Sequence, residues 1–122
     1  MADSQSSPPR GFALHVSIFI APENVPKFFE AFEPAYKKVA AEPECTLFEV
    51  YQDPNSPGEL SWVEHWTESL EWFMEVQVNR DYYAPYLAVT EPMFLKPREF
   101  KILHRVGAPY SVVKKTNGEI RE

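Results

Sequence analysis

Cysteine is nearly absent from this chain, which has only Cys45 among its 122 residues. A single cysteine excludes a disulfide framework and an all-cysteine metal site within one chain. Cys45 begins an expected strand, where a lone cysteine is more often a small buried hydrophobic group than a nucleophile. The three histidines, His15, His65 and His104, show neither HxH nor HExxH spacing, so the sequence predicts no metal site.

Long apolar runs and clusters of positive charge are also missing. No segment approaches the roughly 18 consecutive apolar residues of a membrane span, and the first residues lack the charged and apolar regions of a secretory signal. The chain has 18 acidic and 12 basic residues and a net charge of −6, which repels phosphate backbones. We therefore expect a cytoplasmic protein that binds neither membrane nor nucleic acid.

Aromatic residues, by contrast, are plentiful at 15% of the chain. Their large apolar area indicates either a core rich in rings or a cavity lined by them. The length fits one domain. We expect residues 1–11 to be a disordered lead, residues 12–106 to form the folded domain and residues 107–122 to be a polar tail. Within this tail, residues 110–113 are interpreted as a short edge strand or as an arm that reaches a partner.

Apolar periodicity predicts the elements of the first half. Residues Phe12 to Ile20 alternate with period two, which indicates a strand with apolar groups on both sides. Phe28, Phe32 and their apolar neighbours recur every three or four positions from residue 25 to about residue 41, which predicts an amphipathic helix. Pro34 lies inside this helix and removes one backbone hydrogen bond, so we expect a kink there.

The second half begins with two expected strands, residues 45–52 and 60–66, joined by the turn-rich residues 53–58 as an antiparallel hairpin. Thr67 is the expected N-cap of a second helix. A break near residues 79–81 separates this helix from a further helical stretch at residues 82–91. Residues 100–106 form the last expected strand.

The predicted order is therefore strand, helix, strand, strand, helix, strand. This order is that of the ferredoxin-like βαββαβ fold, an α+β class with helices on one face of a four-stranded antiparallel sheet. The strands carry apolar groups on their other side too, and a chain of this length has nothing left to cover that face. A second copy, related by twofold symmetry, would cover it, so we expect a homodimer.

Two segments resemble a known family. Residues 42–51 (EPECTLFEVY) are similar to the EPGC…Y segment of the antibiotic biosynthesis monooxygenase domain family, and residues 63–69 (VEHWTES) are similar to its E-x-W-x-S segment. The resemblance implies a dimeric α+β barrel. It also implies that the protein oxidises small aromatic or polyketide-like molecules with O₂ and without metal, haem or flavin, so no cofactor is expected.

The sequence departs from this family at two places. Glu44 stands where the family usually has glycine, which changes the turn before the second expected strand. Many relatives carry a histidine early in the second helix, and haem-degrading relatives carry one later. Residues 72–75 and 82–86 contain no histidine, which argues against haem degradation.

Cofactor-free oxygenation requires a base that deprotonates the substrate, a dry pocket and donors that stabilise the resulting anion. His15 is the best candidate base by residue type, although a histidine in such a position is more often a core or interface residue. Trp66 matches the family's strand tryptophan, which implies that it borders the cavity. Trp62 and Glu64 share its side by strand alternation, and a glutamate on a covered face must be paired.

The region where the second helix breaks supplies further candidates. Its amide, guanidinium and hydroxyl groups would orient a phenol, ketone or carboxylate, unless the tyrosines are simply the buried stripe of a helix. We therefore predict His15, Trp66 and Tyr83 as catalytic residues. The predicted substrate-binding residues are Phe32, Glu64, Phe73, Asn79, Arg80, Tyr82 and Tyr86.

The leading functional hypothesis is a cofactor-independent monooxygenase acting on a small hydrophobic molecule that is phenolic, polyketide-like or a cyclic acid. Two alternatives remain open: a non-catalytic dimeric domain that binds a ligand or responds to stress, and a non-redox lyase or isomerase. An open cavity between the sheet and the helices favours an enzyme, whereas a cavity filled by Phe28, Phe32, Phe73 and Trp66 favours a binding or structural role.

Overall fold

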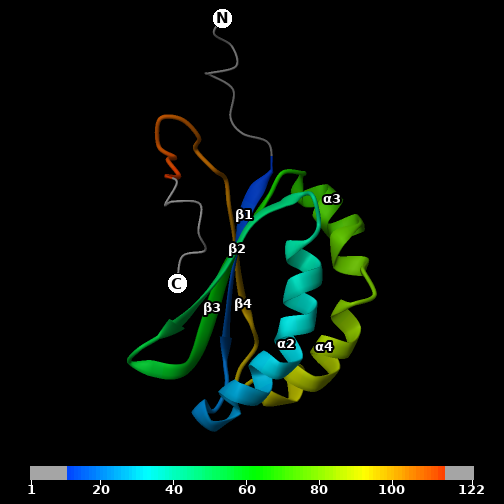
Figure 1. The fold of residues 1–122 in the computed structure, drawn as a ribbon, viewed down its shortest axis with the longest axis vertical. Coiled ribbons are helices and arrows are strands. Elements are labelled where there is room, and N and C mark those ends of the chain that lie inside the picture. Colours follow the sequence, from blue (N-terminus) through cyan, green and yellow to red (C-terminus); the bar gives the residue numbers. More distant parts are fainter. Residues whose placement is uncertain (1–10, 115–122) are drawn as a thin grey trace, which may run out of the picture.

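The computed structural model describes residues 11–114 as one four-stranded antiparallel sheet with its helices on one face (Figure 1). The strands are β1 (Phe12–Phe19), β2 (Cys45–Asp53), β3 (Ser56–Trp66) and β4 (Glu99–Leu103), and they lie in the order β2-β3-β1-β4. The helices are α2 (Val25–Ala40), α3 (Leu70–Glu75) and α4 (Tyr83–Thr90). Three short 3₁₀ turns, η1 (Pro22–Asn24), η2 (Gln77–Asn79) and η3 (Glu91–Met93), complete the described part. This arrangement confirms the predicted ferredoxin-like α+β fold.

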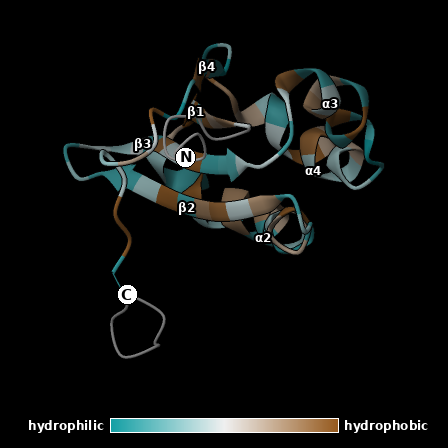
Figure 2. Ribbon diagram, turned by 90° about the horizontal axis from the view of Figure 1, so that it is seen from above, coloured by the Kyte–Doolittle hydropathy of each residue, from teal (hydrophilic) through white to brown (hydrophobic). Residues whose placement is uncertain are grey.

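The core lies between the sheet and the helices, which the view from above shows as separate layers (Figure 2). β1 turns Phe12, Leu14, Val16 and Ile18 toward the helices, and all four are buried. Helix α2 supplies buried residues every three or four positions, as its periodicity predicted. Its Phe32 ring lies 4.9 Å from the ring of Trp62 on β3, so α2 and the sheet are joined mainly by aromatic packing.

The ends of three elements differ from the sequence-based prediction. β3 begins at Ser56, four residues early, and β4 ends at Leu103 because its pairing with β1 ends at the Ala13–Leu103 pair. The N-cap of α3 is Ser69, whose Oγ accepts a hydrogen bond from the backbone N–H of Trp72 at 3.0 Å. The predicted cap at Thr67 was wrong because its backbone N–H bonds the carbonyl of Glu44 at 2.9 Å and extends the strand pairing.

Gly11 fixes the start of β1 against the end of β3. Its φ of +82° suits glycine, and a Cβ there would lie 1.8 Å from the carbonyl oxygen of Trp66. A side chain at this position would therefore push the backbone of Trp66 away from β1.

The sheet face that turns away from the helices is mixed rather than largely apolar, contrary to the expectation from the strand sequences. The pairing register puts His15, Ser17, Ser61, Val63 and His65 on it. Each of these five side chains is half-buried. The face can therefore support polar contacts with a partner as well as apolar ones.

The predicted terminal segments are described only in part. All of the predicted lead except Gly11 lies outside the described residues, and so do residues 115–122. Residues 110–113 form no strand, and Tyr110, Val112 and Val113 are exposed. No helix within residues 11–114 is both long and apolar enough to cross a membrane.

Candidate functional site

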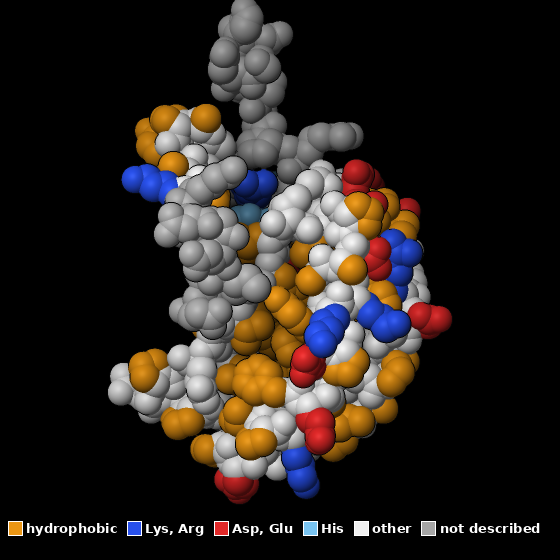
Figure 3. Space-filling view, viewed as in Figure 1, with side chains coloured by type: hydrophobic (Ala, Val, Ile, Leu, Met, Phe, Trp, Pro, Cys, Tyr) orange, Lys and Arg blue, Asp and Glu red, His pale blue; other side chains and the backbone are white. Residues whose placement is uncertain are grey.

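A cavity of about 510 Å³ separates the sheet from the helices, a volume in the range of ligand pockets. The space-filling view shows hydrophobic side chains gathered in this hollow (Figure 3). The lining comes from the sheet (Leu14, Val16, Phe48, Trp62, Glu64, Phe100, Ile102), from α2 (Phe32, Ala35, Tyr36, Val39) and from residues 70–98 (Leu70, Phe73, Met74, Val78, Tyr83, Tyr86, Leu87, Arg98). Its polar groups are few, so each of them is a candidate for chemistry.

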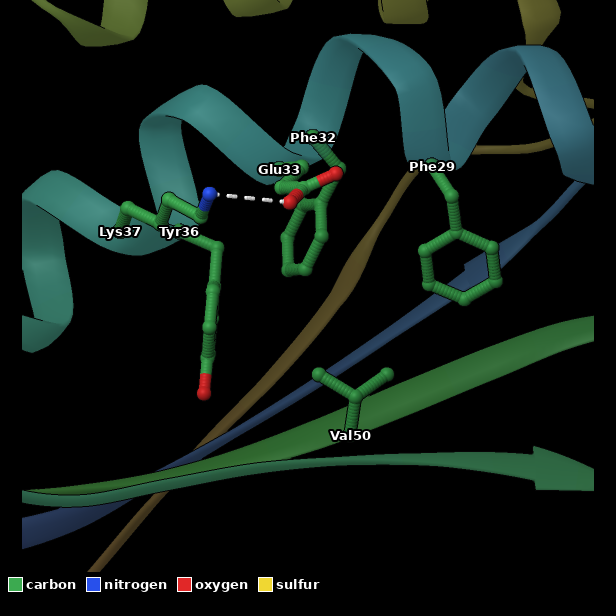
Figure 4. Close-up of a pocket in the computed structure, with 6 residues that line it drawn as sticks. All are labelled: Phe29, Phe32, Glu33, Tyr36, Lys37 and Val50. Carbon is green, nitrogen blue, oxygen red and sulfur yellow. Dashed lines mark ion pairs between the residues drawn. The ribbon is translucent and has the colours of Figure 1, made fainter.

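Between α2 and β2 there is a second, smaller groove of about 290 Å³ (Figure 4). Phe29 and Tyr36 extend from α2 toward the sheet, and Val50 faces them from β2. The charged groups at this groove are Lys37 and Glu33, which form an exposed ion pair at 3.1 Å. The smaller groove thus offers only exposed charges that are paired with each other. We therefore take the larger cavity as the candidate site.

Glu64 is the central polar group of the cavity. Its side chain is 6% exposed. Its Oε1 accepts a hydrogen bond from Trp66 Nε1 at 2.8 Å, and its Oε2 accepts one from Trp62 Nε1 at 3.0 Å. Alternation along β3 puts all three side chains on the same face. Because indole N–H groups only donate, the two tryptophans fix the carboxyl group as an acceptor.

The protonation of Glu64 is set by burial. Burial raises the pKa of this carboxyl group to about 7, although the hydrogen bonds from Trp66 and Trp62 lower it. Among residues 11–114, no basic side chain forms an ion pair with Glu64. Glu64 therefore exchanges its proton near neutral pH, as a general base must.

Tyr83 supplies a hydroxyl group to the same cavity. Its oxygen accepts a hydrogen bond from Gln77 Nε2 at 2.9 Å. No hydrogen bond from the Tyr83 hydroxyl to an acceptor in residues 11–114 is observed, so its hydrogen can be donated to a ligand. Burial raises the pKa of Tyr83, so this residue acts as a donor rather than as a base near neutral pH.

A network of polar side chains holds Gln77 in place. Gln77 is fully buried, and its Nε2 also donates to the hydroxyl of Tyr82 at 2.7 Å. Its Oε1 accepts from Arg80 Nε at 3.3 Å. Glu42 closes the network, because its Oε2 accepts from the Tyr82 hydroxyl at 2.6 Å and lies 3.5 Å from Arg80 Nε. With both ends bonded, the amide of Gln77 has a single orientation.

Tyr86 and Arg98 contribute further polar groups to the cavity. The hydroxyl of Tyr86 is buried and has no hydrogen-bond partner among the described residues. Burial raises the pKa of this hydroxyl to about 12, and the positive charge of Arg98, followed by the neighbouring Thr90 side chain, opposes the rise. The guanidinium carbon of Arg98 lies 5.0 Å from the ring centre of Phe100 and 5.8 Å from that of Phe94.

Cys45 lies near the site but outside the cavity lining. Burial, followed by the negative charge of Glu64, raises the pKa of its thiol to about 11. Because the thiolate is the nucleophilic form, this thiol is inert near neutral pH. Among residues 11–114 there is also no group of three or more His, Cys, Asp or Glu residues arranged to hold a metal ion.

The structure brings half of the predicted site residues to the cavity wall, namely Phe32, Glu64, Phe73, Tyr83 and Tyr86. Three more, Trp66, Arg80 and Tyr82, lie behind the wall and hold Glu64 or Gln77 by hydrogen bonds. The predicted residues therefore form two groups. One group lines the cavity, and the other orients polar side chains of the site by hydrogen bonds.

His15 and Asn79 lie elsewhere. His15 is paired with Val63 and Lys101 on the sheet face opposite the cavity. Asn79 is exposed, and its Nδ2 donates to the backbone carbonyl of Glu75 at the end of α3, at 2.9 Å. The acid–base group that the structure provides inside the cavity is Glu64.

Sequence reasoning missed three residues of the site: Glu42, Gln77 and Arg98. Gln77 had a detectable signal, because it occupies a position in the apolar stripe of the second helical region, where a polar residue must be hydrogen-bonded. Glu42 and Arg98 had none. Glu42 follows the end of α2 and Arg98 precedes β4, and only the path of the chain brings them to the site.

Comparison of the sequence with known proteins gave two matches. The family model described as antibiotic biosynthesis monooxygenase matches residues 11–74. The Pestalotiopsis microspora protein named "Putative monooxygenase GME11364" is 33% identical over 101 residues, which cover 83% of this chain and 84% of that protein.

Solved structures share the fold at lower identity. A conserved protein from Methanosarcina mazei superposes with a TM-score of 0.70 at 20% identity and covers 84% of this chain and 97% of that one. A crystal structure titled as an antibiotic biosynthesis monooxygenase superposes with a TM-score of 0.69 at 15% identity. This match covers 78% of this chain and 98% of that one. At these identities, the two structures support the fold alone.

Proposed function

This chain belongs to the antibiotic biosynthesis monooxygenase family, and we propose that it is a monooxygenase that oxidises a small hydrophobic substrate with O₂. The substrate is a cyclic, phenolic or polyketide-like molecule with an acidic C–H group. One observation carries the proposal: a buried carboxyl group, Glu64, is held between two indole N–H groups inside an aromatic cavity.

Glu64 acts as the base in this proposal. Its carboxylate takes a proton from the acidic carbon of the substrate, and the negative charge moves to the neighbouring substrate oxygen as an enolate or phenolate. The hydroxyl of Tyr83 donates a hydrogen bond to that oxygen, with Gln77 holding the tyrosine in place. The apolar walls exclude water, which strengthens both interactions.

O₂ then reacts with the electron-rich carbanion. One electron passes to O₂, and the resulting superoxide joins the carbon radical to form a peroxide. The peroxide takes back the proton held by Glu64, and the resulting hydroperoxide loses water as its remaining C–H proton is removed, which converts the CH₂ group to C=O. One oxygen atom therefore enters the product and the other leaves as water. The substrate supplies all four electrons, so the scheme requires no metal, haem or flavin.

We further propose that the protein acts as a homodimer in the cytoplasm. The sheet face opposite the cavity carries half-buried groups such as Val63 and His65, and a second copy would cover them. The exposed Tyr110, Val112 and Val113 are suited to contact that copy as an arm. The near-absence of cysteine fits a reducing compartment.

Oxygen consumption tests the reaction and the base together. With a polycyclic hydroxy ketone that has an acidic ring CH₂ group, we expect O₂ uptake and a product heavier by one oxygen and lighter by two hydrogens. Glu64→Gln should lower kcat by roughly 10²–10⁴-fold, the usual contribution of a general base. His15→Ala should keep most of the activity, because His15 lies on the other face of the sheet.

Other results of these experiments would contradict either the assigned base or the proposed reaction. Loss of turnover in His15→Ala with retention in Glu64→Gln would return the base to His15. Glu64-dependent exchange of the substrate C–H for deuterium, without O₂ uptake, would instead indicate a non-redox lyase or isomerase. A cavity that binds no cyclic phenol would favour the non-catalytic alternative.

A further inference from the structure

Arg98 is a half-buried cation at the cavity without a carboxylate partner among the described residues. Its guanidinium carbon is 5.0 Å from the ring centre of Phe100, which also lines the cavity. The neighbouring charges do not neutralise it, because Lys96 and Glu99 pair with each other at 3.6 Å. A guanidinium group that is held by aromatic rings and lacks an anion is preorganised to accept one.

Tyr86 offers a second donor for the same purpose. Its hydroxyl is buried beside the Thr90 side chain but forms no hydrogen bond of good geometry in the described part of the chain, although buried hydroxyl groups are nearly always hydrogen-bonded. Tyr86 and Arg98 both line the cavity and lie close enough to interact electrostatically. A bound oxygen anion would satisfy both groups at once.

We propose that Arg98 and Tyr86 form an anion subsite that selects substrates carrying a carboxylate group. This inference rests on the proposed function, because it assumes that the cavity is the substrate site. The carboxylate forms a two-pronged hydrogen bond with the guanidinium group and accepts a third hydrogen bond from Tyr86.

Glu64, the other charged group of the cavity, determines the orientation of the substrate. A carboxylate placed at Glu64 would meet a group that is itself anionic above its pKa, whereas at Arg98 it meets a cation. The carboxylate therefore binds at Arg98, and the reacting carbon lies toward Glu64 and Tyr83. The substrate class is thus an aromatic or polycyclic acid whose carboxylate is separated from its acidic C–H group by the ring system.

Calorimetric titration with 2-naphthoate and 2-naphthamide tests the subsite without requiring turnover. The two probes have the same ring and nearly the same shape, and only the first is charged. We expect the wild-type protein to bind the acid roughly tenfold or more tightly than the amide, as one charge-assisted pair allows. The preference should disappear in Arg98→Gln, shrink in Tyr86→Phe and survive in part in Arg98→Lys.

A matched control separates the subsite from net charge. Lys27→Gln removes one positive charge from an exposed position of α2 and should leave the preference unchanged. Equal loss in Lys27→Gln and Arg98→Gln would overturn the subsite, and so would equal binding of the two probes by the wild-type protein. The latter result would leave the cavity as a ligand site and the proposed function intact, whereas binding of neither probe would overturn both.

Discussion

At the scale of single residues, Glu64 concentrates the chemistry of this protein. A buried carboxyl group needs compensation, and strand alternation alone placed Glu64 beside Trp62 and Trp66. The sequence alone required a partner for a glutamate on this covered face. The structure provides two neutral indole donors, so the carboxyl group keeps a pKa near neutrality, which a neighbouring arginine would have lowered.

The pKa of Glu64 makes stability depend on pH. Because the folded-state pKa is raised from its ordinary 4.5 to about 7, the folded protein binds this proton more tightly than the unfolded chain. The contribution is fully present below about pH 4.5 and is lost as the pH rises to 7 and above, up to about 3 kcal/mol. Between these limits, the wild-type protein should lose stability relative to Glu64→Gln.

Denaturant unfolding at several pH values in this range gives the unfolding free energy as a function of pH. The effect of Glu64 is a difference between the slopes of these curves for the wild-type protein and Glu64→Gln. The slope is the right quantity because the amide nitrogen of a glutamine would face an indole N–H and lower the stability of the variant at every pH. Glu33→Gln, at an exposed position, is the control and should follow the wild-type protein. Parallel curves for the wild-type protein and Glu64→Gln would refute the raised pKa.

At the scale of elements, the region from α3 to α4 is short and irregular, and polar contacts hold it together. Helix α3 has six residues, fewer than an isolated helix needs for stability. The Ser69 cap closes its start, and Gln77 ties the following turn to α4 through the hydroxyls of Tyr82 and Tyr83. The break that residues 79–81 predicted is therefore a structured turn that positions the donor Tyr83.

Gln77→Leu tests this view of the region. The substitution removes the donor to both tyrosines and the acceptor of Arg80, so we expect a loss of about 1–3 kcal/mol in unfolding free energy. It should also lower kcat more than it raises KM, because Tyr83 would no longer be oriented toward the developing anion. Chemical denaturation and O₂-uptake kinetics measure the two effects.

Gln52→Leu is the matched control for this prediction. Gln52 also donates one hydrogen bond through its amide, to the carbonyl of Pro57 at 2.8 Å, but it is exposed on β2. Its loss should change stability by only a few tenths of a kcal/mol. If Gln77→Leu lowered stability while leaving kcat unchanged, Gln77 would be a structural residue and not a positioning one.

At the scale of the whole molecule, the sheet has helices on only one of its faces. The cavity rim also carries exposed apolar side chains, including Leu70, Met74, Phe100 and Ile102. Clustered exposed apolar groups are typical of ligand or partner sites. The proposed homodimer covers the open sheet face by twofold symmetry.

Val63→Arg tests the dimer. Val63 lies on the open sheet face, where the register pairs it with His15 and Glu49, so the proposed dimer would bury a charge placed there. We expect sedimentation velocity to show a dimer for the wild-type protein and a monomer for Val63→Arg. Val89→Arg, on the exposed side of α4, should remain dimeric. A monomeric wild-type protein at micromolar concentration would refute the assembly.

The sequence by itself determined the order of the elements, the fold class and the shared face of Trp62, Glu64 and Trp66. These features are local, because they follow from the spacing of apolar residues along the chain, which is two in strands and three to four in helices. The same periods placed Phe32, Phe73 and Tyr86 in the aromatic layer. The residues that resemble a family motif added the expectation of an oxidation site.

Only the tertiary structure decided which polar groups meet in the cavity. Strand alternation cannot say which face of the sheet the helices cover, so it did not separate the place of His15 from that of Glu64. Sequence reasoning selected Arg80 as the guanidinium group of the site and had no signal for Arg98. The path of the chain after α4 brings Arg98 to the cavity, whereas Arg80 pairs with Glu42. Contacts between distant segments depend on how the elements pack, and local patterns do not encode that packing.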